Sequence, residues 1–224
     1  NTLKAVGRGS ALTHQLLSFS RQQTLSPAVT DVKQLVEGTL AFLKRTLGEN
    51  IAIITTHSDE ESRVNIDAAV FGNALVNIAL NARDAMPDGG TLTVHTHTVE
   101  VAGETIGLNK EPIYGSHALI TVADTGSGIN AAVLEQVMEP FFTTKEVGKG
   151  SGLGLSMVYG FVSQSNGYLN INSKEGEGTT ISIYLPISDE EQVYKESEAV
   201  PASIVNIRKT ILLVEDDQQV RVTT

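Results

Sequence analysis

The stretch DAAVFGNALVNIALNARDAM, residues 67–86, decides the fold, because it has the period of a helix with two different sides. At about 100° per residue, a polar stripe roughly 80° wide runs along this helix. The stripe consists of Asn73, Asn77, Asn81 and Asp84. The apolar residues on the opposite side are Phe71, Leu75, Ile78, Ala82, Ala85 and Met86. The pattern predicts a helix from Asp67 to Met86, which the breaker PDGG at residues 87–90 ends.

The asparagines of this stripe point to a function. Asparagine is a poor helix former, because its amide competes for backbone hydrogen bonds. A solvated polar face is the ordinary alternative, but such faces usually hold Glu, Lys and Arg. Amide oxygens are suitable ligands for a hard cation that also carries phosphate oxygens. The stripe therefore favours a site for a cation with phosphate over a plain solvent-facing surface.

The other elements are predicted on both sides of this helix. Further helices are expected at residues 3–23, 31–47, 131–138 and 153–165. Strands are expected at residues 51–54, 91–101, 118–123, 168–172 and 179–185. A surface excursion is expected over residues 103–115, and residues 139–152 are expected to be irregular. This order predicts an α+β fold, a two-layer sandwich in which helices cover one face of a mixed sheet, with an N-terminal helical remnant.

Composition limits the partners and the compartment. Apolar residues make up 41% of the 224 residues, which is enough for a core. The chain has no cysteine, which excludes disulfides and thiolate metal sites within it and favours a reducing compartment. The formal net charge of −10 repels nucleic acid and anionic lipid, so we expect no nucleic-acid partner. An anionic ligand must therefore be held locally, by backbone N–H groups, a metal ion or a few lysines.

A second motif, DTGSGI at residues 124–129, follows a predicted strand. The carboxylate of Asp124 can accept a hydrogen bond from the exocyclic amine of adenine, whereas guanine offers an oxygen there. Glycines let a flat base approach the backbone. A capped turn is the alternative, since Asp and Gly are common in turns. The dinucleotide fingerprint G-x-G-x-x-A also matches here, but we reject it, because no acidic residue ends a second parallel strand about 20 residues further on.

A third motif, GKGSGLGL at residues 148–155, is rich in glycine but is not a Walker A sequence. Glycines at alternate positions make a mobile loop, and the start of the following helix presents free N–H groups. Such a loop can wrap a polyphosphate without net positive charge, and Lys145 and Lys149 add local cations. The alternative is a flexible linker, which seldom runs directly into an amphipathic helix.

Five motifs in order resemble those of the gyrase, heat-shock chaperone, histidine kinase and mismatch-repair ATPase superfamily, and specifically its histidine kinases. The matching stretches are an N box at residues 77–85, a G1 box at 124–128, an F box at 139–145, a G2 box at 150–155 and a final glycine box at 176–180. The resemblance implies a Bergerat-type ATP-binding fold. It also implies ATP and Mg²⁺ as the ligands.

The same resemblance implies roles for matching residues. Asn81 and Asn77 would hold Mg²⁺ against the triphosphate. Asp124 would read the adenine amine, with Thr179 nearby through water, and residues 139–152 would form a lid over the nucleotide. The implied ATP-binding residues are Asn77, Asn81, Asp84, Asp124, Gly126, Gly128, Ile129, Phe142, Thr144, Lys145, Lys149, Gly150, Ser151, Gly152, Leu153, Gly154, Leu155 and Thr179.

No residue of this domain is assigned as catalytic with certainty, and Asn77 and Lys145 are the candidates. Gyrase-type members have a glutamate that activates water at the position of Asn77. An asparagine cannot act as a general base. This difference suits an enzyme that transfers a phosphoryl group rather than hydrolysing ATP.

The flanking segments fit the same family. Residues 1–25 resemble the end of the dimerisation and histidine-phosphotransfer hairpin, residues 30–187 the catalytic ATP-binding domain, residues 188–209 a linker, and residues 210–224 the start of a receiver domain. No histidine of the chain fits the pattern of the phosphate acceptor, so we expect that histidine upstream. The implied partners are the histidine-bearing hairpin, a receiver domain or response regulator, and a second copy in a full-length homodimer.

The predicted activity is transfer of the γ-phosphoryl group of ATP to that histidine, for relay to an aspartate of a receiver. We expect the catalytic part to be cytoplasmic, and we expect this fragment to bind Mg·ATP without phosphorylating itself. Two alternatives stay open. One is a serine kinase or plain ATPase of the same fold, and the other is a degenerate nucleotide-binding docking module.

Overall fold

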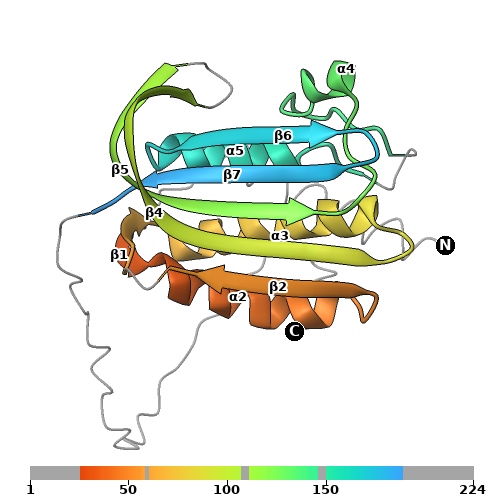
Figure 1. Ribbon diagram of the computed structural model, residues 1–224, viewed down its shortest axis with the longest axis horizontal. Coiled ribbons are helices and arrows are strands. Elements are labelled where there is room, and N and C mark those ends of the chain that lie inside the picture. Colours follow the sequence, from red (N-terminus) through yellow and green to blue (C-terminus); the bar gives the residue numbers. More distant parts are fainter. Residues whose placement is uncertain (1–25, 59–60, 107–110, 146–149, 189–224) are drawn as a thin grey trace, which may run out of the picture. The chain divides into compact units, whose positions relative to one another are not determined.

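A five-stranded mixed sheet carries the architecture of the chain (Figure 1). The computed structural model describes residues 26–58, 61–106, 111–145 and 150–188. The strands are β2 (Ile51–His57), β4 (Gly90–Ile106), β5 (Glu111–Asp124), β6 (Tyr168–Lys174) and β7 (Gly178–Pro186), in the order β2-β4-β5-β7-β6. β2 runs parallel to β4, and the other neighbouring pairs are antiparallel.

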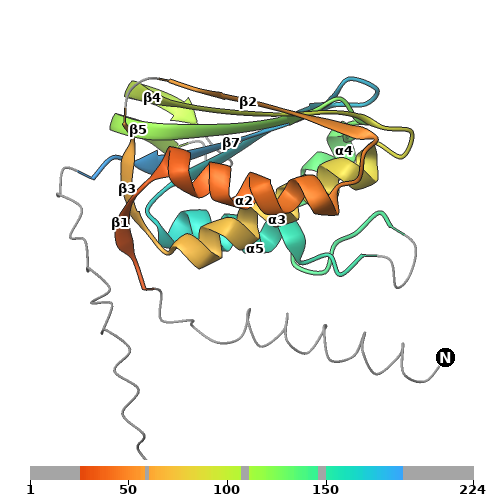
Figure 2. The same cartoon turned by 90° about the horizontal axis from the view of Figure 1, so that it is seen from below.

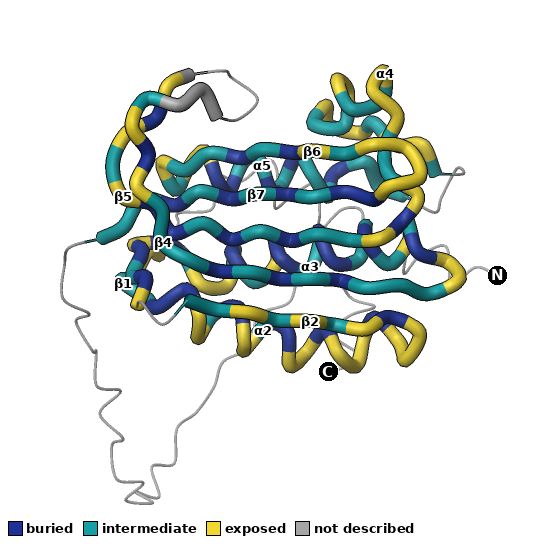
Figure 3. The backbone as a smooth tube through the Cα atoms, viewed as in Figure 1, coloured by how far each residue is buried: buried dark blue, intermediate teal, exposed yellow. Residues whose placement is uncertain are grey.

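Three helices lie on one face of this sheet (Figure 2). They are α2 (Val32–Thr46), α3 (Ala68–Ala85) and α5 (Gly154–Gln164). Side chains of the central strands alternate between buried and partly exposed (Figure 3), as expected where only one face is covered. Between the helices, Phe71 packs edge-on against Phe161, with ring centroids 6.0 Å apart. The predicted two-layer α+β sandwich is confirmed.

Capping side chains determine where two of the helices begin. The carboxylate of Asp31 accepts a hydrogen bond from the Lys33 N–H at 3.0 Å. Asp31 thus caps α2, which begins at Val32, as predicted. Asp67 accepts from two backbone N–H groups of the first turn of α3, at 3.0 and 3.1 Å. α3 therefore covers nearly the whole predicted range, and its polar stripe is fixed relative to the sheet.

Beyond the part of β5 that pairs with β7, residues 100–106 of β4 and 111–116 of β5 continue as a curved two-stranded arm (Figure 1). The expected excursion over residues 103–115 does leave the sheet, but most of it is strand rather than loop, because β4 continues to Ile106 and β5 begins at Glu111. The pairing continues across a bulge that contains Gly103, whose φ of +91° suits glycine. Gly103, where the expected excursion began, therefore lies in a bulge within a longer strand.

The arm has a small apolar interior of its own. Val101 and Ile113 are buried but lie outside the main hydrophobic core. Tyr114, in contrast, has 68% of its surface exposed. Because β5 runs from the arm to Asp124, the arm lies at the opposite end of this strand from the residue predicted to read the base.

Other boundaries also differ from the predictions. The helix expected at residues 131–138 is only one turn, α4 (Ala131–Leu134), although Leu134, Val137 and Met138 pack partly buried against the core. The strand expected at residues 51–54 continues to His57 as β2. A two-stranded antiparallel sheet of β1 (Ala28–Asp31) and β3 (Arg63–Ile66) was not predicted, because four-residue strands are too short to show alternation.

Several predictions fall outside the described residues. The helical remnant at residues 1–25, nearly all of the linker at 188–209 and the receiver start at 210–224 lie there, so they stay predictions. Within the described part of the chain, every helix is too short or too polar to cross a membrane.

Candidate functional site

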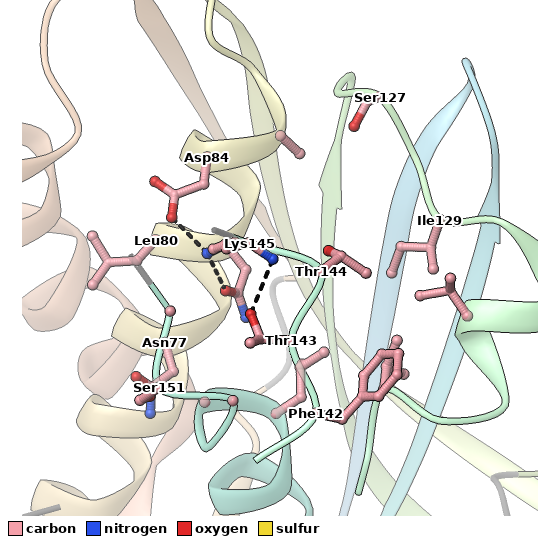
Figure 4. A pocket seen from close by; sticks show the side chains of 18 of the residues that line it. Asn77, Leu80, Asp84, Ser127, Ile129, Phe142, Thr143, Thr144, Lys145 and Ser151 are labelled. Atoms are coloured by element: carbon pink, nitrogen blue, oxygen red, sulfur yellow. Dashed lines mark hydrogen bonds and ion pairs between the residues drawn. The ribbon is translucent and has the colours of Figure 1, made fainter. Parts of the chain in front are cut away.

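A pocket of about 580 Å³ lies beside α3 (Figure 4). It is bounded by α3, the turn after β5, and residues 142–145 and 150–155. Thirteen of the residues implied to bind ATP line it: Asn77, Asn81, Asp84, Gly128, Ile129, Phe142, Thr144, Lys145, Gly150, Ser151, Gly152, Gly154 and Leu155. Three motifs that are far apart in the sequence therefore meet at one cavity.

The other implied residues lie elsewhere. Asp124 and Gly126 immediately precede the part of the turn that lines the pocket, and Thr179 is the strand partner of Asp124. Leu153 is fully buried just before α5. Lys149 is outside the described residues. The sequence reasoning did not assign the following lining residues to the site: Leu80, Arg83, Ala85, Ser127, Asn130, Val133, Val137 and Thr143. Among the apolar ones, Ala85 had been named, on the apolar side of the helix.

Backbone donors from the turn after β5 and from β7 hold the carboxylate of Asp124. Its Oδ1 accepts hydrogen bonds from the N–H groups of Gly126 at 2.8 Å and Thr179 at 3.3 Å. Within the described residues no hydrogen bond to Oδ2 is seen, which leaves this oxygen available to a ligand. Burial raises the pKa of Asp124 above its ordinary value, although the two backbone donors oppose this effect. The group is a partly desolvated acceptor at a strand end.

Two glycines of the turn after β5 are required by close contacts. A Cβ on Gly126 would lie 2.7 Å from the Cβ of Ala85 in α3. Gly128 has a φ of +67°, and a Cβ there would overlap the carbonyl oxygen of Lys174. The turn is also tied by the Ser127 N–H, which donates to the Ala85 carbonyl at 3.0 Å. The backbone therefore lies tightly between α3 and the β6–β7 hairpin.

The polar stripe of α3 divides into two parts. Asn77 and Asp84 line the pocket (Figure 4), as does Asn81 between them. Asn73, in contrast, is exposed and does not line it. The start of α5 faces the same stripe, because a Cβ built on Gly154 would lie 3.6 Å from the Asn81 amide nitrogen. The N-terminus of α5, with its free N–H groups, thus lies across the pocket from the amides of α3.

Lys145 reaches across the pocket to this stripe (Figure 4). Its ammonium lies 3.3 Å from Oδ1 of Asn81 and 2.6 Å from Oδ2 of Asp84. Arg83 also pairs with Asp84, at 2.9 Å. Burial raises the pKa of Asp84, but hydrogen bonds and charges from Lys145 and Arg83 outweigh it, so the pKa lies below its ordinary value.

Backbone contacts join the two ends of the predicted lid, residues 139–152. The Phe141 N–H donates to the carbonyl oxygen of Gly152 at 2.9 Å. Phe141 has a positive φ of 71°, and a Cβ on Gly152 would overlap its backbone. The segment is therefore closed at its base.

The residues present fit a magnesium ion that is shared with phosphate. Within the described residues there is no cluster of three or more His, Cys, Asp or Glu side chains that could hold a metal ion. Oδ1 of Asn81 and Oδ2 of Asp84 already accept a cation, the Lys145 ammonium. Such amide and carboxylate oxygens suit Mg²⁺, which takes most of its remaining ligands from water and phosphate.

Comparisons with known proteins find similarity over the region that contains this pocket. The family model described as histidine kinase-, DNA gyrase B-, and HSP90-like ATPase matches residues 66–189. Sensor kinase CckA of Brucella abortus (strain 2308) is 40% identical over 228 residues, which cover 99% of this chain and 24% of that protein. The chain thus spans about a quarter of the length of this relative.

Solved structures resemble the chain as well. The mycobacterial sensor histidine kinase MprB is 26% identical with a TM-score of 0.58, covering 72% of this chain and 97% of that one. Full-length ShkA in complex with AMPPNP has a TM-score of 0.66 at 21% identity, covering 84% of this chain and 38% of that one. The second likeness concerns the fold alone.

Proposed function

Because this chain belongs to the family of histidine kinase-, DNA gyrase B- and HSP90-like ATPases, we propose that its pocket binds Mg·ATP and transfers the γ-phosphoryl group to a histidine. In this proposal the histidine lies on a dimerisation hairpin of the full-length protein, and an aspartate of a receiver domain accepts the group next. The chain is then the catalytic ATP-binding part of a two-component sensor kinase.

One observation carries the proposal: the pocket combines amides with a carboxylate that is already paired. Asp84 is the only carboxylate among the described lining residues, and Lys145 and Arg83 both hold it. The other polar residues of the stripe are Asn77 and Asn81, and an amide cannot remove a proton from water. The pocket thus supports transfer to an acceptor brought from outside over hydrolysis by a bound water.

Each group of the pocket has a task in this reaction. Asn81 and Asn77 would hold Mg²⁺, which supplies neutralisation of charge on the phosphates. The Asp124 carboxylate would accept a hydrogen bond from the adenine amine. The N–H groups at the start of α5 and the ammonium of Lys145 would surround the phosphate oxygens. Phosphoryl transfer depends mostly on such positioning and charge, so no protein nucleophile is needed in this domain.

The wider assignments belong to the same proposal. We place the hairpin remnant at residues 1–25, the catalytic domain at 30–187, a linker at 188–209 and the beginning of a receiver at 210–224. The full-length protein is a homodimer with its catalytic part in the cytoplasm. The similarity to sensor kinase CckA of Brucella abortus extends over 99% of the chain, which supports placing the flanking segments in the same type of protein as the catalytic domain.

Labelled ATP tests the transfer step. The chain is incubated with Mg²⁺ and γ-labelled ATP, alone and with a separately produced histidine-bearing hairpin. We expect acid-labile phosphate on the hairpin and none on the chain itself. Acid-stable phosphate would indicate a serine kinase of this fold, and free phosphate without labelled protein would indicate an ATPase. Nucleotide binding without either product would indicate a docking module.

A further inference from the structure

A row of three polar side chains crosses the sheet where its strands end beside the pocket. Asp124 of β5 pairs in register with Thr179 of β7, and Thr179 pairs with Ser173 of β6. Thr179 has the same strand parity as the buried Ile181, so the row faces the helices. The two members of the predicted base site, Asp124 and Thr179, are thus followed by Ser173, a serine that no motif had singled out.

The hydroxyl of Ser173 connects three parts of the site. It accepts a hydrogen bond from the Ile129 N–H at 2.8 Å, in the turn that lines the pocket. Its single proton has two possible acceptors, the Gly178 carbonyl oxygen at 3.0 Å and Oγ1 of Thr179 at 2.9 Å. Because a backbone N–H can only donate, it fixes the direction of one bond in this chain.

We propose that Ser173 is a positioning residue for the purine, which orients the hydroxyl of Thr179 toward a ring nitrogen of adenine. When Ser173 donates to Oγ1 of Thr179, the Thr179 proton is free to point outward. Hydrogen bonds then run from Ile129 through Ser173 and Thr179 to the unprotonated nitrogen beside the adenine amine, directly or through one water. Chains of aligned hydrogen bonds strengthen one another.

This assignment complements that of Asp124 and deepens the proposed function, on which it rests. Asp124 accepts from the amine of the base, and the Ser173–Thr179 pair donates to the adjacent ring nitrogen. The two together recognise the donor–acceptor pair on that edge of adenine. The hydrogen bonds of the Ser173 hydroxyl among the described residues go to Ile129, Gly178 and Thr179 and not to α3 or Lys145, so we expect its effect to be confined to the base.

Calorimetry with modified nucleotides tests the inference. Ser173→Ala should weaken Mg·ATP binding about 5- to 10-fold, the value of roughly one neutral hydrogen bond. Purine riboside triphosphate lacks the amine but keeps the ring nitrogen, so its binding should fall by a similar factor. Binding of 1-deaza-ATP, which lacks this nitrogen, and of inorganic tripolyphosphate should be unchanged by the substitution. Ser173→Thr keeps the hydroxyl and should restore ATP binding.

The control is Ser182→Ala, a serine on β7 whose side chain alternates away from the buried residues and from the helix-covered face. It should bind all four ligands as the wild type does. Equal ATP affinity of Ser173→Ala, or an equal loss with tripolyphosphate, would overturn the assignment. So would a wild-type protein that binds 1-deaza-ATP as tightly as ATP, a result that needs no variant to fold. Failure of the wild type to bind Mg·ATP at all would instead overturn the proposed function.

Discussion

The two ends of the pocket are held together in different ways. At the base end, strand register and backbone donors fix Asp124 and Thr179. The tightly packed Gly128 fixes the turn that follows β5. At the phosphate end, the main link across the pocket is one long side chain, Lys145, which reaches two residues of α3. The side chains of Lys145 and Asp84 are each about one-third exposed. Many backbone bonds thus hold the first end, and a screened ion pair closes the second.

This difference indicates how the site divides its work. A base has a fixed shape and a fixed set of donors and acceptors, so its site is best built from the sheet. A phosphate chain must enter with its metal ion and leave without its last group, so the part that covers it must open. Local openings require less free energy where fewer buried contacts are lost. We therefore expect substitutions at the base end to affect stability or recognition strongly, and substitutions at the phosphate end to affect closure.

The largest effect is expected from Gly128→Ala. The added Cβ would overlap the Lys174 carbonyl oxygen, and the positive φ would also strain an alanine. We expect the free energy of unfolding to fall by about 3 kcal/mol, measured by urea denaturation. The matched control is Gly176→Ala, which has a φ of +81° but nothing within 4 Å of an added Cβ. It should cost only about 1 kcal/mol, the strain alone; equal losses for the two would show that the contact with Lys174 is not what requires glycine.

Asp124→Asn should come next, with ATP affinity about 100-fold lower, because an amide replaces a charged acceptor and a second donor then faces the adenine amine. Stability at pH 7 should be unchanged or higher. Burial raises the pKa of Asp124, so its contribution to stability is full below its ordinary value of 3.8 and is lost as the pH rises through the higher folded-state pKa. Calorimetry and thermal melts from pH 3 to 8 measure both effects.

Asp88→Asn provides the control for this charge change, since Asp88 is exposed in the turn before β4. It should leave ATP affinity within about twofold of the wild type, as expected of a screened surface charge. A parallel loss of stability and affinity in Asp124→Asn would mean that the carboxylate supports the fold rather than the base.

Lys145→Met tests the phosphate end and should have a smaller effect. The variant loses a partly exposed ion pair, so cleavage of residues 143–151 in the nucleotide-free protein should become about 2- to 5-fold faster. A protease that does not cut after lysine is required. Mg·ATP should slow cleavage in the wild type and protect the variant less. Arg83→Gln is the control, because the hydrogen bonds that the Arg83 side chain makes among the described residues go to Asp84 and not to residues 143–145 or 150–151. Faster cleavage in that variant as well would argue against a specific role for Lys145.

The smallest effect is expected at Gly160, on α5 and away from both ends. An added Cβ has nothing within 4 Å, so Gly160→Ala should raise the free energy of unfolding by about 0.5–1 kcal/mol through helix propensity alone. ATP affinity should not change. A change in affinity would show that the stability of α5 itself contributes to binding, and the division between the two ends would then need revision.

The sequence predicted which residues gather around the pocket better than it predicted the bounds of the elements that carry them. Helical spacing was enough to bring Asn77, Asn81 and Asp84 onto one stripe, because α3 is long and regular. The contact between Lys145 and Asn81 spans 64 residues, and no local pattern reports such a distance. Ser173 gave no signal either, since its role comes from strand register. Glycine was ambiguous: Gly103 was interpreted as a loop but lies in a bulge.

Asparagine 73 shows a further limit of pattern reasoning. It belongs to the same stripe as Asn77 but lies one turn too far along α3 to line the pocket. Periodicity gives the direction in which a side chain points and not where along the helix its partner lies. The length of the pocket along α3 is set by the turn after β5 and by the start of α5, neither of which the helix sequence contains.

The β4–β5 arm offers a practical handle. Its exposed Tyr114 is at the opposite end of β5 from Asp124, and the chain has no cysteine. Tyr114→Cys would therefore create a unique thiol for attaching a fluorophore or a surface tether. Immobilised through the arm, the domain would leave its nucleotide entrance unobstructed, which suits it to measurements on single molecules.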